Sequence, residues 1–166
     1  MFAILIFICS MIPTLFGLYF AVISLFSLRK VSPPARRPPK VRFALVIPAR
    51  NEESVIENLI HSLHCQDYPR ELFEIFVVPN HCTDHTADVS RRAGARILSC
   101  RASVRSKGEV LHDAIQQLLP LDYDAFCIFD ADNLADKNFL SSMNDAISAG
   151  GRVLHNYCVK TKMVLL

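Results

Sequence analysis

Two carboxylates one residue apart are the feature of this sequence that most directly suggests chemistry. Asp130 and Asp132 flank Ala131 and directly follow the apolar run 125–129. Carboxylate oxygens are hard ligands, so such a pair on a turn can hold one Mg²⁺ or Mn²⁺ ion, which in turn binds a diphosphate. Aspartates are also common as ordinary turn and capping residues. The pair alone therefore leaves a metal site and a structural turn as two open interpretations.

Two further polar clusters follow apolar runs in the same way. Residues 49–53 come after the run 43–47, and residues 80–84 come after the run 73–78. Ligands of parallel sheets bind at the carboxyl ends of the strands, where these clusters would meet. The sequence has no G-x-G-x-x-G and no Walker lysine loop, so NAD and P-loop chemistry have no support. The clusters predict a site for a ligand with hydroxyls and a metal-bound phosphate.

The elements that must position these clusters alternate along the chain. Strands are predicted at 43–47, 73–78, 95–98, 125–129 and 153–159. The predicted helices begin at Asn51 as an N-cap, at Asp84, at Ser106 in an S-x-x-E capping box, and at Asp136. This order predicts an α/β domain with a mostly parallel sheet and helices on both faces.

The first 28 residues contain no charged side chain. As a helix they would extend roughly 40 Å, against the ~30 Å hydrocarbon core of a bilayer. A cleaved signal peptide would need a basic segment before the apolar run and a small-residue cleavage site, so we expect 1–28 to be a retained transmembrane anchor. Residues 29–41 follow as an extended, solvated linker rich in proline and cations, and 42–166 form the domain.

The cations that follow the anchor predict its orientation. They place the domain in the cytoplasm, at a bacterial-type plasma membrane. They also account for most of the net charge of +2, which therefore does not indicate nucleic-acid binding.

The six cysteines are scattered and form no C-x-x-C pair. On the predicted cytoplasmic side we expect reduced thiols. A zinc site is conceivable but disfavoured, because the candidate ligands match no usual spacing. These candidates are His61, His64, Cys65, His81, Cys82 and His85.

Five sequence blocks together resemble the family-2 glycosyltransferases, and they occur in that family's order. They are IPARNEE at 47–53, QDYP at 66–69, VVPNHCTDHT at 77–86, SKG at 106–108 and FDADN at 129–133. The resemblance covers about 42–156. It is similar above all to the cellulose, hyaluronan and poly-N-acetylglucosamine synthases.

The resemblance implies a GT-A fold, a Rossmann-like α/β arrangement that binds a nucleotide-sugar donor. It implies one Mg²⁺ or Mn²⁺ ion held by Asp132 with Asp130. The donor-binding residues that it implies are Pro48, Ala49, Glu52, Asn80, Lys107 and Asp130. The implied activity is a metal-dependent, inverting transfer from a donor such as a UDP-sugar to a polysaccharide, lipid or other acceptor.

The sequence departs from the family pattern at two places. Asn80 stands where the family has an aspartate, so a hydrogen bond to the base would lack charge assistance. The E-D motif that supplies the general base and the Q-x-x-R-W acceptor segment have no match before Leu166. We therefore expect the acceptor-binding part to be missing, and no residue here is assigned as the base.

Two alternatives to a complete transferase stay open. One is a catalytically incomplete module that binds the nucleotide sugar without turnover. The other is a phosphatase of the haloacid-dehalogenase type, in which Asp130 and Asp132 would be nucleophile and acid. The phosphatase leaves the block at 47–53 unexplained.

Overall fold

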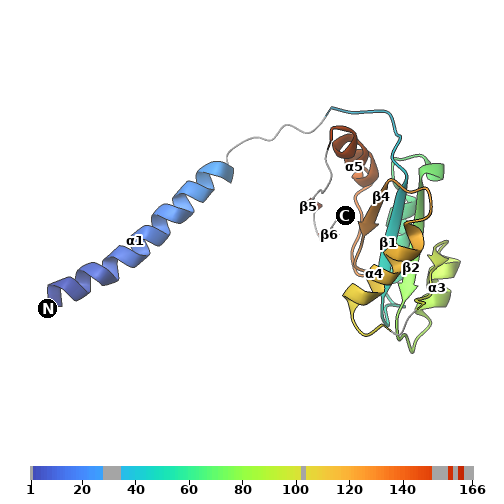
Figure 1. The fold of residues 1–166 in the computed structure, drawn as a ribbon, viewed down its shortest axis with the longest axis horizontal. Coiled ribbons are helices and arrows are strands. Elements are labelled where there is room, and N and C mark those ends of the chain that lie inside the picture. The colour runs from blue at the N-terminus through green and yellow to red at the C-terminus, as the bar shows by residue number, and fades with distance from the viewer. Residues whose placement is uncertain (1, 28–34, 102–103, 151–156, 159–160, 163–166) are drawn as a thin grey trace. The chain divides into compact units, whose positions relative to one another are not determined.

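The structure is a computed structural model that describes residues 2–27, 35–101, 104–150, 157–158 and 161–162. Side chains are described for 10–26, 35–101 and 104–150. The chain divides into two units, Met1–Pro33 and Pro34–Leu166, and each is described by itself (Figure 1).

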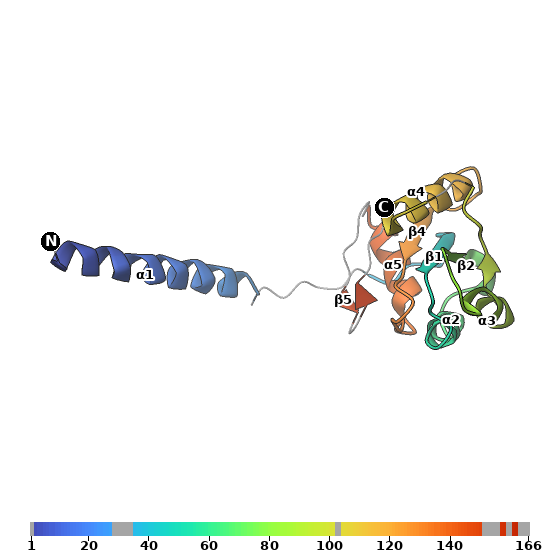
Figure 2. The same ribbon diagram turned by 90° about the horizontal axis from the view of Figure 1, so that it is seen from below.

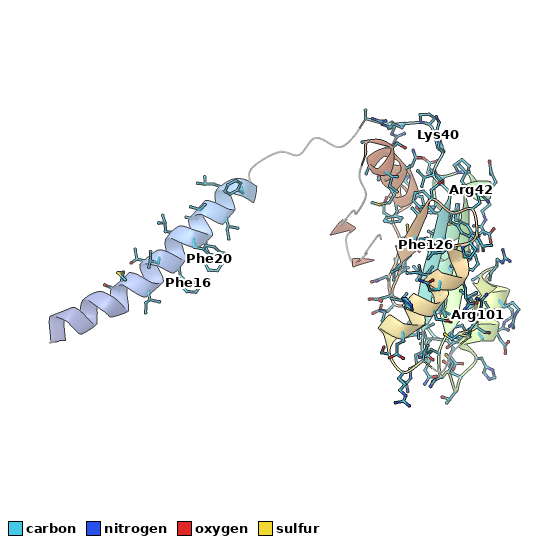
Figure 3. The ribbon with its side chains drawn as sticks, in the orientation of Figure 1. Phe16, Phe20, Lys40, Arg42, Arg101 and Phe126 are labelled. Carbon is cyan, nitrogen blue, oxygen red and sulfur yellow. The ribbon has the colours of Figure 1, made fainter. Side chains whose placement is uncertain are left out.

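In the first unit the structure describes one helix, α1 (Phe2–Ser27), which includes Pro13. Its large apolar side chains between Met11 and Phe26 are exposed, among them Phe16 and Phe20 (Figure 3). In the part of the chain that the structure describes, no helix combines the length and the apolar character that crossing a membrane requires. The predicted anchor at 1–28 lies partly outside that part, which omits residues 1 and 28 and the side chains of 2–9 and 27.

The second unit is built on a parallel sheet. Its strands are β1 (Phe43–Ala49), β2 (Phe73–Pro79), β3 (Arg96–Ile97) and β4 (Ala125–Ile128), in the order β3-β2-β1-β4. The helices are α2 (Ile56–His64), α3 (Thr86–Arg92), α4 (Lys107–Leu118) and α5 (Phe139–Ser148), with a 3₁₀ turn η1 (Arg70–Leu72) before β2. All pairings within this sheet are parallel, which confirms the predicted α/β class.

The predicted fifth strand at 153–159 falls largely outside the described residues. Its described part, β5 (Tyr157–Cys158), pairs antiparallel with β6 (Thr161–Lys162). These two strands form a separate sheet.

Alternating side chains of the strands fill two cores, one on each face of the sheet. Phe43, Leu45 and Ile47 pack with the buried residues of α2 and α5. Ala44 and Val46 pack with those of α4. Figure 2 shows α4 on one face of the sheet and α2 and α3 on the other. Helices on both faces of the sheet are thus confirmed. Successive side chains of a strand point to opposite faces and both faces are covered, which explains why each strand is a continuous apolar run in the sequence.

Two predicted helix caps have different outcomes. Ser106 caps α4 as predicted, since its Oγ accepts a hydrogen bond from the Glu109 N–H at 3.2 Å. Asn51 does not cap α2, which begins five residues later with Val55 at its N-cap position. Asn51 instead has a φ of +56° in the turn after β1, a conformation that asparagine tolerates better than most residues. Its Oδ1 accepts a hydrogen bond from the Thr83 N–H at 2.8 Å, so the side chain joins two loops.

The backbone from Arg37 to Val41 is bound to α5 by Asn144, an arrangement called here the Asn144 clamp. The Asn144 side chain is fully buried. Its Oδ1 accepts hydrogen bonds from the N–H groups of Lys40 at 3.0 Å and Val41 at 3.3 Å. Its Nδ2 donates to the carbonyls of Arg37 and Pro38 at 3.3 Å each. The end of the segment predicted as a solvated linker therefore has a fixed backbone, with exposed side chains up to Lys40 and a buried side chain at Val41.

Candidate functional site

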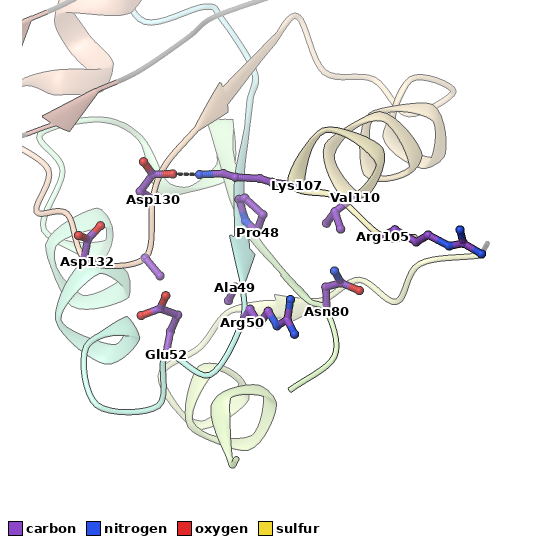
Figure 4. Close-up of a pocket in the computed structure, with 11 residues that line it drawn as sticks. Pro48, Ala49, Arg50, Glu52, Asn80, Arg105, Lys107, Val110, Asp130 and Asp132 are labelled. Carbon is purple, nitrogen blue, oxygen red and sulfur yellow. Dashed lines mark hydrogen bonds and ion pairs between the residues drawn. The ribbon is translucent and has the colours of Figure 1, made fainter. Parts of the chain in front are cut away.

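A cavity of about 380 Å³ lies at the carboxyl ends of β1 and β4 (Figure 4). It is lined by all seven residues predicted for the donor or the metal. These are Pro48, Ala49, Glu52, Asn80, Lys107, Asp130 and Asp132. The fold thus brings residues that are up to 84 positions apart in the sequence (132 minus 48) into one cavity.

The parallel register explains this convergence. Ala49 at the end of β1 lies beside Pro79 at the end of β2, and the Asn80 N–H donates to the Ala49 carbonyl at 2.9 Å. On the other side of β1, the Phe129 N–H donates to the Val46 carbonyl at 3.0 Å. The three polar loops therefore start at the same edge of the sheet, as expected for a parallel α/β site.

An ion pair crosses the cavity from α4 to the end of β4. Lys107 Nζ contacts Asp130 Oδ1 (Figure 4). Both side chains are partly exposed, at 55% and 41%. Asp132 is exposed, and its carboxylate makes no hydrogen bond or ion pair with the described residues. Asp132 is therefore the more available of the two carboxylates for a ligand.

Four lining residues were not predicted, namely Arg50, Arg105, Val110 and Ala131. The arginines change the electrostatics of the cavity. Figure 4 shows the carboxylates of Glu52, Asp130 and Asp132 on one side and the guanidinium groups of Arg50 and Arg105 on the other. The cavity thus offers one side to a cation and another to an anion. Both arginines are next to predicted motif residues, and that adjacency is the signal that was overlooked.

A buried hydroxyl holds the loop that carries Glu52. Thr86 is fully buried, and its Oγ1 accepts a hydrogen bond from the Glu52 N–H at 2.9 Å while it donates to Asp84 Oδ1 at 2.6 Å. The other oxygen of Asp84 accepts from the Glu53 N–H at 3.2 Å, and Glu53 Oε2 accepts from the His85 N–H at 2.8 Å. The Thr86 hydroxyl, first among several hydrogen bonds, lowers the pKa of Asp84. These contacts, called here the Thr86 brace, tie the loop after β1 to the start of α3.

Asn80 lies where the resemblance places the contact to the base. Its Oδ1 is 3.1 Å from Nδ1 of His81, a residue with a φ of +51°. A second acceptor position on this oxygen and the amide Nδ2 are left for a ligand. The side chain can thus form uncharged hydrogen bonds in place of the charge-assisted ones of an aspartate.

The residues at the end of β4 fit a divalent metal whose remaining ligands come from elsewhere. Across the described ranges, no three His, Cys, Asp or Glu side chains gather closely enough to hold a metal by themselves, and this includes the six zinc candidates. Mg²⁺ and Mn²⁺ need only one or two carboxylates when phosphate oxygens and water complete the shell. Asp132, with Asp130 beside it, provides such a donor set.

Comparison with known proteins identifies the family. A sequence model described as "Glycosyltransferase like family 2" matches residues 38–155. The chain belongs to this family. Family membership over residues 38–155 contradicts the phosphatase alternative.

Individual family members resemble the chain at modest identity. The probable glycosyltransferase YdaM of Bacillus subtilis is 27% identical over 106 residues, which are 60% of this chain and 24% of YdaM. A mannosyltransferase from Pyrobaculum calidifontis, solved in complex with GDP-Man and Mn²⁺, is 25% identical with a TM-score of 0.64. That match covers 82% of this chain and 41% of the mannosyltransferase.

A third match supports the fold alone. The structure of Staphylococcus aureus TarS 1-349 is 24% identical with a TM-score of 0.60, over 69% of this chain and 34% of TarS. The chain thus spans about a quarter of the curated relative YdaM and less than half of the solved structures that it matches.

Proposed function

We propose that this chain binds the nucleotide-sugar donor of a glycosyltransferase that transfers the sugar to a saccharide or lipid acceptor. One observation carries the proposal: all seven residues assigned to the donor and the metal line one cavity with a cationic and an anionic side. A metal-bound diphosphate needs both, because its metal requires carboxylates while its phosphates require cations.

The roles follow from position and charge. The nucleoside is bordered by Pro48, Ala49 and Asn80. Glu52 borders the nucleoside as well. Lys107 lies near the diphosphate. Asp132 is the main protein ligand of the metal, whose positive charge offsets the charge that builds on the departing nucleoside diphosphate.

Two unpredicted residues join the phosphate side. Arg50 and Arg105 provide charges for the phosphate oxygens from the side of the cavity opposite the carboxylates.

Transfer with inversion further needs a base that takes the proton of the acceptor hydroxyl. We assign that base to no residue of this chain, so the property proposed for the chain itself is donor binding.

The nucleotide that we propose is uridine diphosphate, on the basis of the resemblance to polysaccharide synthases. The Pyrobaculum mannosyltransferase was solved with GDP-Man, so guanosine diphosphate is the matched comparison. Uncharged hydrogen bonding at Asn80 permits either base.

The proposal is tested by calorimetric titration of the full chain with UDP and with GDP, with and without Mn²⁺. We expect UDP binding that needs Mn²⁺ and that falls by at least about tenfold in Asp132→Ala, a loss typical of a disturbed metal site. Asp67→Ala is the matched control, since Asp67 is exposed and lines none of the described cavities. A folded chain that binds neither nucleotide under any of these conditions would refute the proposal.

We further propose that residues 1–28 anchor the protein in a membrane, with the domain on the cytoplasmic side. The support is the absence of charge from 1–28, the exposure of apolar side chains along α1, and the cations that follow residue 28. Extraction of cell membranes with carbonate tests this directly. The full chain should stay in the pellet and a chain of residues 35–166 should not; release of both would exclude the anchor.

A further inference from the structure

The loop 129–138, which carries Asp132, is hydrogen-bonded in its second half to α2 and to the turn that follows α2. Three consecutive residues of the loop are bound to residues between 62 and 67. The bonds join the Ala135 N–H to Ser62 Oγ at 3.0 Å, Gln66 Nε2 to the Asp136 carbonyl at 2.7 Å, and the Asp67 N–H to the Lys137 carbonyl at 2.7 Å. On the side of the loop, all three bonds are made by backbone groups.

Gln66 makes the most bonds in this set of contacts, which is called here the Gln66 network. The residue is buried, with 8% of its surface exposed. Its Nε2 donates to the carbonyls of Asp136 at 2.7 Å and Ser62 at 3.3 Å, and its Oε1 accepts from the Leu140 N–H at 3.0 Å. One side-chain amide thus joins the end of α2 to the end of the loop and to the first turn of α5.

The position of Asp132 depends on the backbone of this loop, because its carboxylate makes no hydrogen bond or ion pair with the described residues. On the N-terminal side, the Phe129 N–H donates to the main chain of β1 at 3.0 Å, and the Asn133 N–H donates to the Asp130 carbonyl at 3.1 Å. On the C-terminal side, the loop is held by the Gln66 network. The network therefore helps to set where a metal bound by Asp132 would lie.

The helix α2 links this loop to a second carboxylate of the donor cavity. The start of α2 is bound to the loop after β1, because the Glu52 carbonyl accepts from the N–H groups of Val55 at 3.1 Å and Ile56 at 3.0 Å. One side of the helix lines a further cavity of about 370 Å³ together with residues 132–134. Its other end carries the Gln66 network. The helix thus holds the loops of Glu52 and Asp132 at a fixed separation.

We propose that Gln66 is a positioning residue for the metal, which acts through the backbone of the loop that carries Asp132. Ser62 supports the same loop through the Ala135 N–H. Neither residue lines the donor cavity, so neither contacts the donor or the metal itself. This inference rests on the proposed function, because the metal is assigned to Asp132 only under that proposal.

The test measures how much Mn²⁺ the chain needs. The full chain is titrated with UDP by calorimetry at increasing Mn²⁺ concentrations, and the concentration that gives half of the maximal UDP affinity is the Mn²⁺ midpoint. Gln66→Met removes the amide with little change in length, and we expect it to raise the Mn²⁺ midpoint by about tenfold, as for other outer contacts that orient a metal ligand. Ser62→Ala removes the acceptor of the Ala135 N–H and should raise it by about threefold, the value of one hydrogen bond.

Asn144→Ala is the control for a loss of stability alone. It also deletes a buried side-chain amide, but one that binds the backbone of 37–41 and not the loop of Asp132. All variants are compared under conditions in which circular dichroism shows that they are folded. The Mn²⁺ midpoint of Asn144→Ala should equal that of wild type. An equal rise in Asn144→Ala and Gln66→Met would show that the effect is one of stability and would overturn the inference.

A second measurement needs no metal. Hydrogen exchange of the metal-free chain, followed by mass spectrometry, should be at least about tenfold faster at residues 132–140 in Gln66→Met than in wild type and unchanged in β1. If Gln66→Met does not fold, Ser62→Ala decides by the same two measurements. If wild type binds UDP with Mn²⁺ but the folded variant leaves the Mn²⁺ midpoint unchanged, the inference is overturned and the donor site stands. If folded wild type binds no nucleotide, the proposed function fails and the inference fails with it.

Discussion

Lys107 and Asp130 form an ion pair with each other, and the proposed function assigns both residues to the donor site. Their ion pair is partly exposed, so it contributes little to the stability of the fold. A diphosphate would compete with Asp130 for the ammonium group, and a metal would compete with Lys107 for the carboxylate. Under the proposed function, the pair therefore keeps two binding groups in place in the cavity without burying either charge.

Replacing Lys107 by methionine separates its contribution to nucleotide binding from its contribution to the stability of the fold. We expect the affinity for UDP with Mn²⁺ to fall by about three- to tenfold, the value of one hydrogen bond whose charge is screened in a partly exposed site. The free energy of unfolding should change by less than about 1 kcal/mol. Lys137→Met, on an exposed residue outside the described cavities, is the control for loss of charge. An unchanged UDP affinity in Lys107→Met would show that the lysine does not contact the nucleotide.

Asp84 gives the fold a defined dependence on acid. Because the pKa of its carboxyl is lowered in the folded chain from the ordinary value of 3.8, its stabilising contribution is present above that value. The contribution is lost as the pH falls through the lowered folded pKa. In urea unfolding, the difference between wild type and Asp84→Asn should be constant from about pH 7 to about pH 5 and should shrink below the ordinary value. If the difference in unfolding free energy between wild type and Asp84→Asn grew on acidification, it would contradict a lowered pKa of Asp84.

Much of the candidate site was predictable at the level of residues because its side chains are next to strand ends. Strand ends are marked by apolar runs, and the parallel arrangement then makes Asp130, Glu52 and Asn80 neighbours. Arg50 and Arg105 were missed because adjacency to a motif residue does not by itself separate an arginine of the site from a solvated one. The pair of Lys107 with Asp130 was not predictable either, since it depends on how α4 begins relative to β4.

At the scale of elements, the loops after β1 and β2 act as one unit. Thr86, at the start of α3, fixes the backbone of Glu52, and Asn51 fixes the backbone of Thr83 in return. Asn51 and His81 both have positive φ values, so each loop contains one sparsely populated conformation. The sequence suggested a helix cap at Asn51 because asparagine serves both roles, and only the contact across to the second loop decides between them.

The brace is tested with three substitutions in α3. Thr86→Val keeps the shape but leaves the partly buried Glu52 N–H without its acceptor, which should destabilise the fold by about 1–3 kcal/mol and weaken UDP binding. Thr86→Ser keeps the hydroxyl and should cost about 1 kcal/mol for the lost methyl group while UDP binding is retained. Ser90→Ala removes a buried hydrogen bond to the Thr86 carbonyl and controls for stability alone. Equal UDP affinities in Thr86→Val and Ser90→Ala would show that the brace does not position the cavity.

At the scale of the whole molecule, the domain begins earlier than its hydrophobic pattern indicates. The composition predicted a boundary at residue 42, where the proline-rich and basic stretch ends. The Asn144 clamp engages the chain from Arg37, and the family match begins at residue 38. Composition did not indicate this earlier start, because composition reflects only how side chains interact with water. The backbone hydrogen bonds of the same residues are made to a buried amide 103 or more positions away in the sequence.

Truncation tests the boundary. A chain starting at residue 42 removes the four backbone partners of Asn144, so it should be less stable than one starting at residue 35 by about 1–3 kcal/mol. Asn144→Ala should destabilise the longer chain and have little further effect on the shorter one. Additive effects of the truncation and the substitution in urea unfolding would show that the clamp is not the cause.

The clamp recognises peptide groups and not side chains. Its partners are two N–H groups and two carbonyls, so the exposed side chains of 37–40 are not part of it, although a proline at Lys40 or Val41 would remove an N–H group that it uses. We therefore expect that the segment preceding residue 37 can be exchanged for a soluble partner or an affinity tag without loss of the clamp, which makes this junction a suitable point for engineered fusions.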